Sequence, residues 1–239
     1  MTSTKTSILL LVLLINTCCT HPRYLHAVQK PIIPASAYNH DKFNTEPKDI
    51  IKEFRAFVTS FDSPDDDDND GKADILGIPE FVAYEIKRYD GDCIPTKDRP
   101  KWFADPKLIS DGIAPKDDSY KYSKEWRKDH PNRYERGHLA MKLIAERLGH
   151  DAAHNTHTLL NAVPQRKKFN RGIWLDMEYL TAAWAQRYGA VWVITGPVFY
   201  NGAPKEWIGE AEKGELLVAV PDALFKIVIR RNHIIICSI

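Results

Sequence analysis

The sequence has few of the features that mark membrane proteins, disulfide-rich scaffolds or P-loop nucleotide-binding proteins. The longest unbroken apolar run is Ile8–Ile15, and this run is too short to span a bilayer. Four cysteines in 239 residues are too few for a disulfide-rich scaffold. A glycine-rich phosphate loop and an internal repeat are also missing, so P-loop and solenoid architectures are excluded.

The first 20 residues have the order of an export signal. Lys5 supplies a short positive region, Ile8–Ile15 supplies the apolar region, and cleavage is expected between Thr17 and His21. Asn16-Thr17 is a poor approach to a lipidated Cys18 or Cys19, so lipoprotein anchoring is not favoured. We expect a secreted or periplasmic protein with no membrane segment in its mature form.

Two cysteines remain after cleavage. Cys93 and Cys237 would meet oxidising conditions outside the cytoplasm, so a Cys93–Cys237 disulfide is a candidate. The sequence alone does not show whether their Cα atoms are close enough to be bridged.

Charge is unevenly spread, although the net charge is only +1. Residues 61–80 are acidic, whereas thirteen lysines and arginines stand against seven acids in residues 121–187. Such a basic stretch favours a polyanionic partner. The ordinary alternative is a solvated surface, which charge alone favours.

Hydrophobic periodicity predicts a mixed succession of helices and strands. The predicted helices cover 48–59, 141–148 and 172–188, and the predicted strands cover 81–88, 158–161, 190–195, 216–220 and 224–230. A Gly-Pro turn is expected directly after residue 195. This order indicates an α+β fold. We divide the chain into a signal peptide (1–20), an N-terminal extension with a helix and an acidic Asp-rich loop (21–74), and a main domain (75–239).

The acidic run resembles a calcium-binding loop. Asp66, Asp68, Asp70 and Asp74 occupy positions 1, 3, 5 and 9 of that pattern, but Gly77 stands where a bidentate Glu is expected. A solvated acidic linker is the alternative, and the incomplete pattern favours it.

The chemistry-bearing residues lie between positions 134 and 178. His138 follows Gly137, and a neutral imidazole can act as a general base near neutral pH. Asn161, Gln165 and Asn170 are neutral amides set among basic residues, and an amide oxygen is a hard ligand suited to Mg²⁺. For any one of these residues, an ordinary structural role is the simpler explanation.

Asn170 and Glu178 are eight residues apart, which on one helix is about 80° of rotation and roughly 12 Å of rise. Both can therefore face one cleft, with Asn170 as the direct ligand and Glu178 holding a metal-bound water. Arg99 and Arg136 are candidates to grip phosphate oxygens. A zinc site at His150, His154 and His157 is a weaker alternative, because Gly149 should end the preceding helix.

Together the strings ERGHLA and LLNAVPQRKKFNRGIWLDME closely resemble the DNA/RNA non-specific endonucleases. These are ββα-metal, or His-Me finger, enzymes, and the resemblance spans roughly residues 78–230. It implies a central, mostly antiparallel sheet flanked by helices. It further implies a Mg²⁺-dependent endonuclease that cleaves DNA and RNA through phosphate contacts and leaves 5′-phosphate ends. Mn²⁺ could replace Mg²⁺.

The resemblance also assigns residue roles. It implies His138 as the general base, Asn170 as the Mg²⁺ ligand and Glu178 as the holder of a metal-bound water. Arg99 and Arg136 would contact the phosphates near the scissile bond. Asn161 and Gln165 match positions that shape the site or touch the substrate.

Two departures from the family pattern leave alternatives open. Glu135 replaces the Asp of the family signature Asp-Arg-Gly-His, and the sequence ends in HIIICSI, where family members usually continue with a further strand. An unpaired apolar edge is expected there. The alternatives are a catalytically impaired nucleic-acid-binding protein and a calcium-regulated binding module. A homodimer is also open.

Overall fold

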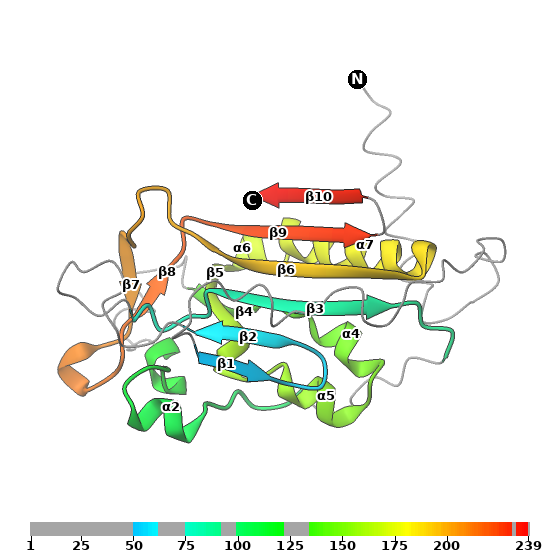
Figure 1. Ribbon diagram of the computed structural model, residues 1–239. Helices are drawn as coiled ribbons and strands as arrows, with labels where there is room; N and C mark the ends of the chain where they lie inside the picture. The colour runs from blue at the N-terminus through cyan, green and yellow to red at the C-terminus, as the bar shows by residue number, and fades with distance from the viewer. Residues whose placement is uncertain (1–49, 62–74, 92–98, 122–133, 231–232, 239) are drawn as a thin grey trace.

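The computed structural model describes residues 50–61, 75–91, 99–121, 134–230 and 233–238. A six-stranded antiparallel sheet organises these residues in the order β1-β2-β3-β6-β9-β10. Its strands are β1 (Ile50–Glu53), β2 (Val58–Phe61), β3 (Phe81–Lys87), β6 (Ala190–Val198), β9 (Ala223–Arg230) and β10 (His233–Ser238). Figure 1 shows them stacked edge to edge, with helix α7 (Ile173–Tyr188) running alongside β6 and β9.

The central strand β6 is buried on both faces. Val191 and Val193 belong to the main core, and Trp192 and Ile194 belong to a second apolar cluster on the opposite side. The strand was predicted and is confirmed, but the expected Gly-Pro turn is wrong, since Gly196-Pro197 stays paired with β9. Proline is tolerated here because β6 pairs with β3 only as far as Thr195, so no ladder bond to β3 is lost.

The helix predicted over residues 48–59 is wrong, because residues 50–59 belong to the β1-β2 hairpin. The apolar spacing that imitates a helix arises from the turn, where the Phe54 and Phe57 rings stack at 4.7 Å and the Phe54 amide donates to the Phe57 carbonyl. Strand β2 pairs with β3, so the hairpin belongs to the central sheet. The predicted N-terminal extension therefore supplies two strands of that sheet.

A second antiparallel pair and the helices after it form a separate unit beside the sheet. Strand β4 (Tyr134–His138) pairs with β5 (Ala162–Arg166), and α6 (Lys167–Asn170) and α7 follow at once. The connection between the two strands holds α4 (Lys142–Glu146), α5 (His150–Asn155) and the 3-10 turn η4 (Leu159–Asn161). This strand-strand-helix unit carries the candidate site.

The predictions in this region met different outcomes. Helix α7 is confirmed and ends at Gly189, and a short helix is present within 141–148. The strand predicted at 158–161 is wrong, because Thr158 caps a 3-10 turn by accepting a hydrogen bond from the Leu160 amide. The remaining elements are short. They are α2 (Pro106–Ser110), η3 (Asp117–Tyr120), β7 (Glu206–Ile208), η5 (Ala211–Lys213) and β8 (Val218–Val220).

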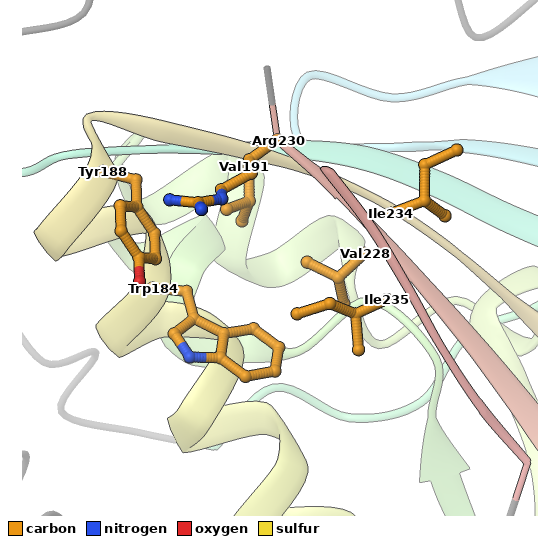
Figure 2. Close-up of a pocket in the computed structure, with 7 residues that line it drawn as sticks. All are labelled: Trp184, Tyr188, Val191, Val228, Arg230, Ile234 and Ile235. Carbon is orange, nitrogen blue, oxygen red and sulfur yellow. The ribbon is translucent and has the colours of Figure 1, made fainter. Parts of the chain in front are cut away.

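The HIIICSI segment forms β10 as far as Ser238 and pairs with β9 as the last strand of the sheet. Ile234 and Ile236 are 66% and 69% exposed, so the expected apolar edge is present. Figure 2 shows Trp184 facing Ile235 across the groove between this edge and α7. The groove has a volume of about 420 Å³, and the Arg230 guanidinium lies 4.1 Å from the Tyr188 ring centre.

Several sequence predictions concern residues outside the described ranges. The signal peptide, the calcium loop at Asp66, Asp68, Asp70 and Asp74, and Cys93 of the candidate disulfide are among them. These stay predictions. Among the helices that the structure describes, none has the length and apolar character needed to cross a bilayer.

Candidate active site

A cleft of about 810 Å³ lies where the β4-β5 pair meets α6 and α7. It brings together five of the seven residues expected to form the site, namely Arg99, Arg136, His138, Asn170 and Glu178. The other lining residues are Pro100, Trp102, Tyr120, Lys121, Tyr134, Glu135, Arg171 and Leu175. Basic and aromatic side chains dominate this set, which suits a polyanion with planar bases.

The residue before His138 must be a glycine because the space above it is occupied. A Cβ atom at Gly137 would lie 2.0 Å from Cδ of Gln165, since the Gln165 side chain crosses from β5 directly over this residue. The close approach fixes how β4 and β5 pack, and it presents His138 at the end of β4. Glycine is therefore required here by space.

His138 sits in an aromatic pocket. The Trp102 ring centre lies 4.6 Å from the imidazole, and the His157 ring lies 4.7 Å away, edge-on. Burial, reinforced by His157, Arg99 and Lys142, lowers the pKa of His138 well below its usual range. The ring is therefore neutral at neutral pH and can accept a proton.

Helix α7 holds the backbone of His138 in place. Trp174, in the first turn of α7, is 1% exposed, and its indole Nε1–H donates to the His138 carbonyl at 3.0 Å. The Lys226 ammonium lies 4.1 Å from the Trp174 ring centre, within cation–π distance. The strand that presents the imidazole is thus tied to the helix that carries Glu178.

Glu135 accepts a hydrogen bond from Asn170, the expected metal ligand. Its carboxylate accepts from Nδ2 of Asn170 at 3.0 Å and from Nε and Nη2 of Arg171 at 3.0 and 2.7 Å. Although burial alone would raise it, the hydrogen bonds from Arg171 and Asn170 hold the pKa of the Glu135 carboxyl below its usual value. With Nδ2 held by this anion, Oδ1 is the atom of Asn170 left to bind a cation. Sequence reasoning named Glu135 only as a departure from the signature.

Glu178 is nearly buried at the cleft, with 9% exposure. Burial raises its pKa to about 7, against the lowering effects of Lys226 and of a hydrogen bond from Trp174. The hydroxyl of Tyr84 donates to the Leu139 carbonyl at 3.4 Å, and burial together with Glu178 raises the pKa of Tyr84. Lys226, 0% exposed on β9, went unnoticed in the sequence because it lies within an ordinary strand pattern.

Asn170 and Glu178 both line the cleft, but the prediction that one helix carries them is wrong. Gly172 separates α6 from α7, with backbone angles of φ −113° and ψ −113°. A Cβ there would lie 2.5 Å from the Lys168 carbonyl oxygen. The break re-aims the chain between the two residues, so the rotation calculated for a single helix does not apply.

The two arginines differ in how firmly they are held. Arg136 is paired with Asp117 through Nη2 at 2.6 Å and lies 5.3 Å from the Tyr120 ring centre. Arg99 is exposed at the cleft, and its charge helps to lower the pKa of His138. Both positions suit contact with phosphate oxygens.

Asn161 and Gln165 do not line this cleft. Asn161 is 0% exposed, and its amide hydrogen-bonds the backbone of Ala140 and Thr156. Gln165 is 3% exposed and packs on Gly137. The expectation that they contact substrate is therefore corrected: both are buried, and they shape the strands that carry His138.

The three histidines of the zinc alternative do not converge on one site. His150 and His154 are exposed on α5, whereas His157 is buried against His138. The part of the chain that the structure describes contains no group of three His, Cys, Asp or Glu side chains placed to hold a metal. His157 and Trp102 instead pack on His138, which the sequence did not indicate for either residue. The Arg99-x2-Trp102 spacing was the available signal for Trp102.

Comparisons with known proteins identify the family. The model of the DNA/RNA non-specific endonuclease family matches residues 69–234, which is more than half of the chain. The human proteins "Nuclease EXOG, mitochondrial" and "Endonuclease G, mitochondrial" are 32% and 31% identical over 102 and 99 residues, or 41% and 40% of this chain. These segments cover only 27% and 33% of those two relatives.

A crystal structure of the EndoG/EndoGI complex, which concerns the mechanism of EndoG inhibition, superposes on this chain with a TM-score of 0.55. It is 21% identical and covers 79% of this chain and 71% of that chain, so this likeness concerns the fold. The molecule has the ββα-metal nuclease fold. The chain belongs to the DNA/RNA non-specific endonuclease family.

Proposed function

We propose that this protein is a Mg²⁺-dependent endonuclease that hydrolyses phosphodiester bonds of DNA and RNA. One observation carries the proposal. A neutral histidine, an amide with an oxygen left for a cation, a nearly buried carboxyl group and two arginines all line one basic cleft. Family membership supports a nuclease activity, and the residue roles rest on this geometry.

The donor set fits a hard cation that keeps most of its waters. Asn170 offers one amide oxygen, and Glu178 lies at the same cleft and would act through a water. The described residues provide no three-ligand cluster, which agrees with Mg²⁺ better than with zinc. Bound there, the cation would stabilise the charge that develops on the phosphate and on the leaving 3′ oxygen. Mn²⁺ has the same preference for oxygen ligands and could replace it.

The chain's own residues would perform the proton transfer and the positioning. His138 takes a proton from the attacking water, whose oxygen bonds to phosphorus as the bond to the 3′ oxygen breaks. The 3′ oxygen then takes a proton from solvent, and the other product carries a 5′-phosphate. Arg99 and Arg136 hold the phosphate, and Trp102 offers a face for a neighbouring base.

The cleft carries little means of reading sequence. Phosphate contacts position a nucleic acid without selecting bases. The substrate range that we propose is therefore DNA and RNA, single-stranded or duplex, held by charge and weakened by salt.

We also propose that the protein is exported, on the order of residues in positions 1–20. The two human relatives are mitochondrial by name, which is a statement about those proteins. N-terminal sequencing of the protein recovered outside the cytoplasm checks this proposal. A mature protein that still begins at Met1 would contradict it.

Cleavage of plasmid DNA and of RNA tests the activity, with Mg²⁺ and with EDTA. His138→Ala and Asn170→Ala should each lower the rate by about 100-fold or more, the range of lost general-base or metal assistance. His150→Ala is the matched control, because His150 is exposed outside the cleft. Full metal-dependent cleavage by folded His138→Ala would overturn the proposal. Salt-sensitive binding without cleavage by the wild type would favour the impaired-nuclease alternative instead.

A further inference from the structure

His157 forms a cluster of three rings with His138 and Trp102. The His157 ring centre lies 4.7 Å from His138 and 5.1 Å from Trp102, and it meets His138 edge-on at 78°. The side chain is 0% exposed. Its backbone carbonyl accepts from the Phe103 amide at 3.0 Å, which fixes the segment that carries Trp102. An imidazole in such a place is an unusual filler, because it carries two polar nitrogens.

The ring nitrogens of His138 and His157 differ in their hydrogen-bond partners. Nε2 of His138 and Nε2 of His157 are both buried, and neither has a hydrogen-bond partner within the described part of the chain. The other nitrogen of His157, Nδ1, lies 3.4 Å from Oγ1 of Thr156. The Thr156 hydroxyl already donates to the Ala153 carbonyl at 2.7 Å, so its Oγ1 meets Nδ1 of His157 as an acceptor. Nδ1 is thus the nitrogen of His157 that carries a proton.

This pattern determines what each Nε2 can do. Since Nε2 of His138 is buried, a water in the cleft can reach only Nδ1 of that ring. For Nδ1 to accept a proton, the neutral ring must carry its own proton on Nε2. A buried N–H without an acceptor is destabilising, because it has lost its hydrogen bond to water. Nε2 of His157, with its proton on Nδ1, is an unprotonated acceptor on the facing ring.

We propose that His157 is a positioning residue, whose Nε2 accepts a hydrogen bond from Nε2–H of His138 and so keeps the Nδ1 lone pair of His138 directed into the cleft. The proposal rests on the general-base role of His138. Small ring rotations would close the contact, since the ring centres are 4.7 Å apart. Both rings are neutral in this arrangement, in keeping with the lowered pKa values of His138 and His157, the latter about 4. In other proteins, a backbone carbonyl or a carboxylate that accepts a hydrogen bond from one imidazole nitrogen fixes the tautomer and orientation of the ring in the same way.

Imidazole NMR tests the hydrogen bond directly. Wild-type protein labelled with ¹⁵N-histidine is recorded at pH 7.5, and the His138 signals are assigned by their loss in His138→Gln. We expect the Nε2–H tautomer at His138 and the Nδ1–H tautomer at His157. An Nδ1–H tautomer at His138 would overturn the proposal, whether or not the protein cleaves nucleic acid. A wild-type protein without nuclease activity would instead count against the proposed function.

Two variants separate positioning from packing. His157→Phe keeps an aromatic ring but has no nitrogen, and His157→Gln places an amide oxygen near the position of Nε2. We expect kcat to fall about 10- to 100-fold in His157→Phe, the usual cost of removing outer support from an imidazole. KM for nucleic acid and the Mg²⁺ requirement should hold, and His157→Gln should recover most of the rate. Unchanged kcat in folded His157→Phe, or equal losses in both variants, would contradict the proposal. If His157→Phe does not fold, the wild-type tautomer and His157→Gln decide.

Discussion

The two walls of the cleft are built on opposite principles. The wall that carries His138 is aromatic, and its rings are neutral because burial lowers the pKa values of His138 and His157. The wall that carries Asn170 is ionic, with an exposed arginine and a carboxylate that together fix the amide. A proton acceptor needs a ring that stays neutral, whereas a cation ligand needs a fixed oxygen next to negative charge.

Helix α7 and strand β9 join the two walls. Trp174 bonds the backbone of His138, Glu178 lies one helical turn further on, and Lys226 lies beneath both. A buried cation next to a buried carboxyl group offsets part of the cost of removing each from water. Helix α7 and strand β9 therefore hold the two walls at a fixed distance from each other, as a catalytic site requires.

The largest expected effect comes from closing the space above Gly137. Gly137→Ala places a Cβ 2.0 Å from Cδ of Gln165, so β4 must move and carry His138 with it. We expect cleavage to fall about 100-fold or more, since small misplacements are costly. The overpacked core should also lower the free energy of unfolding by about 1–3 kcal/mol. Denaturant melts and initial rates measure the two losses.

The double variant Gly137→Ala/Gln165→Ala is the control for this prediction. It removes the side chain that the new methyl group meets, so part of the lost stability and rate should return. If the double variant is no better than Gly137→Ala, then the clash with Gln165 is not the reason for this glycine.

An intermediate effect is expected on the ionic wall. Glu135→Ala frees the Asn170 amide, and we expect the Mg²⁺ concentration for half-maximal rate to rise about 10- to 100-fold. Arg171→Ala leaves the Asn170 contact in place. It removes an arginine whose side chain is 62% exposed, so its effect should be only a few-fold. Mg²⁺ titrations of both variants separate the contributions, and equal shifts would mean that Glu135 acts through Arg171 rather than through Asn170.

The sequence predicted the parts of the molecule that depend on local pattern. Helix α7 follows its amphipathic spacing to Gly189, and β6 follows a continuous apolar run. It failed where tertiary contacts decide. The hairpin at 50–61 joins the sheet by pairing with β3. The Asn161 amide is fully engaged by the backbone of Ala140 and Thr156. A single sequence carries no signal of such long-range partners.

The site divides in the same way. The motif placed His138, Asn170 and Glu178 together, because the chemistry requires those residue types. Its supporting residues had no such signal: Lys226 lies in a plain strand pattern, and His157 was considered only as part of the weaker zinc alternative. Their roles arise from burial against residues far along the chain, which spacing cannot show.

The smallest expected effect is on the pH dependence, and it follows from the aromatic wall that carries His138. The active form of His138 is the neutral ring, and burial with the nearby His157, Arg99 and Lys142 lowers its pKa below the ordinary 6.5. Between pH 7.5 and pH 6, kcat/KM at saturating Mg²⁺ should therefore change by less than about twofold, whereas a histidine of pKa 6.5 would lose about three-quarters of its neutral form. The acid limb should appear at lower pH.

Glu178 is the group that could imitate this limb, since burial raises its pKa to about 7 in the absence of a cation. A bound cation favours the carboxylate, so saturating Mg²⁺ moves the titration of Glu178 to lower pH. Residual cleavage by Glu178→Gln then assigns the limb, because a limb that persists in this variant belongs to His138. A limb centred at or above 6.5 in both proteins would mean that His138 titrates like an exposed imidazole, and the contrast between the two walls would fail.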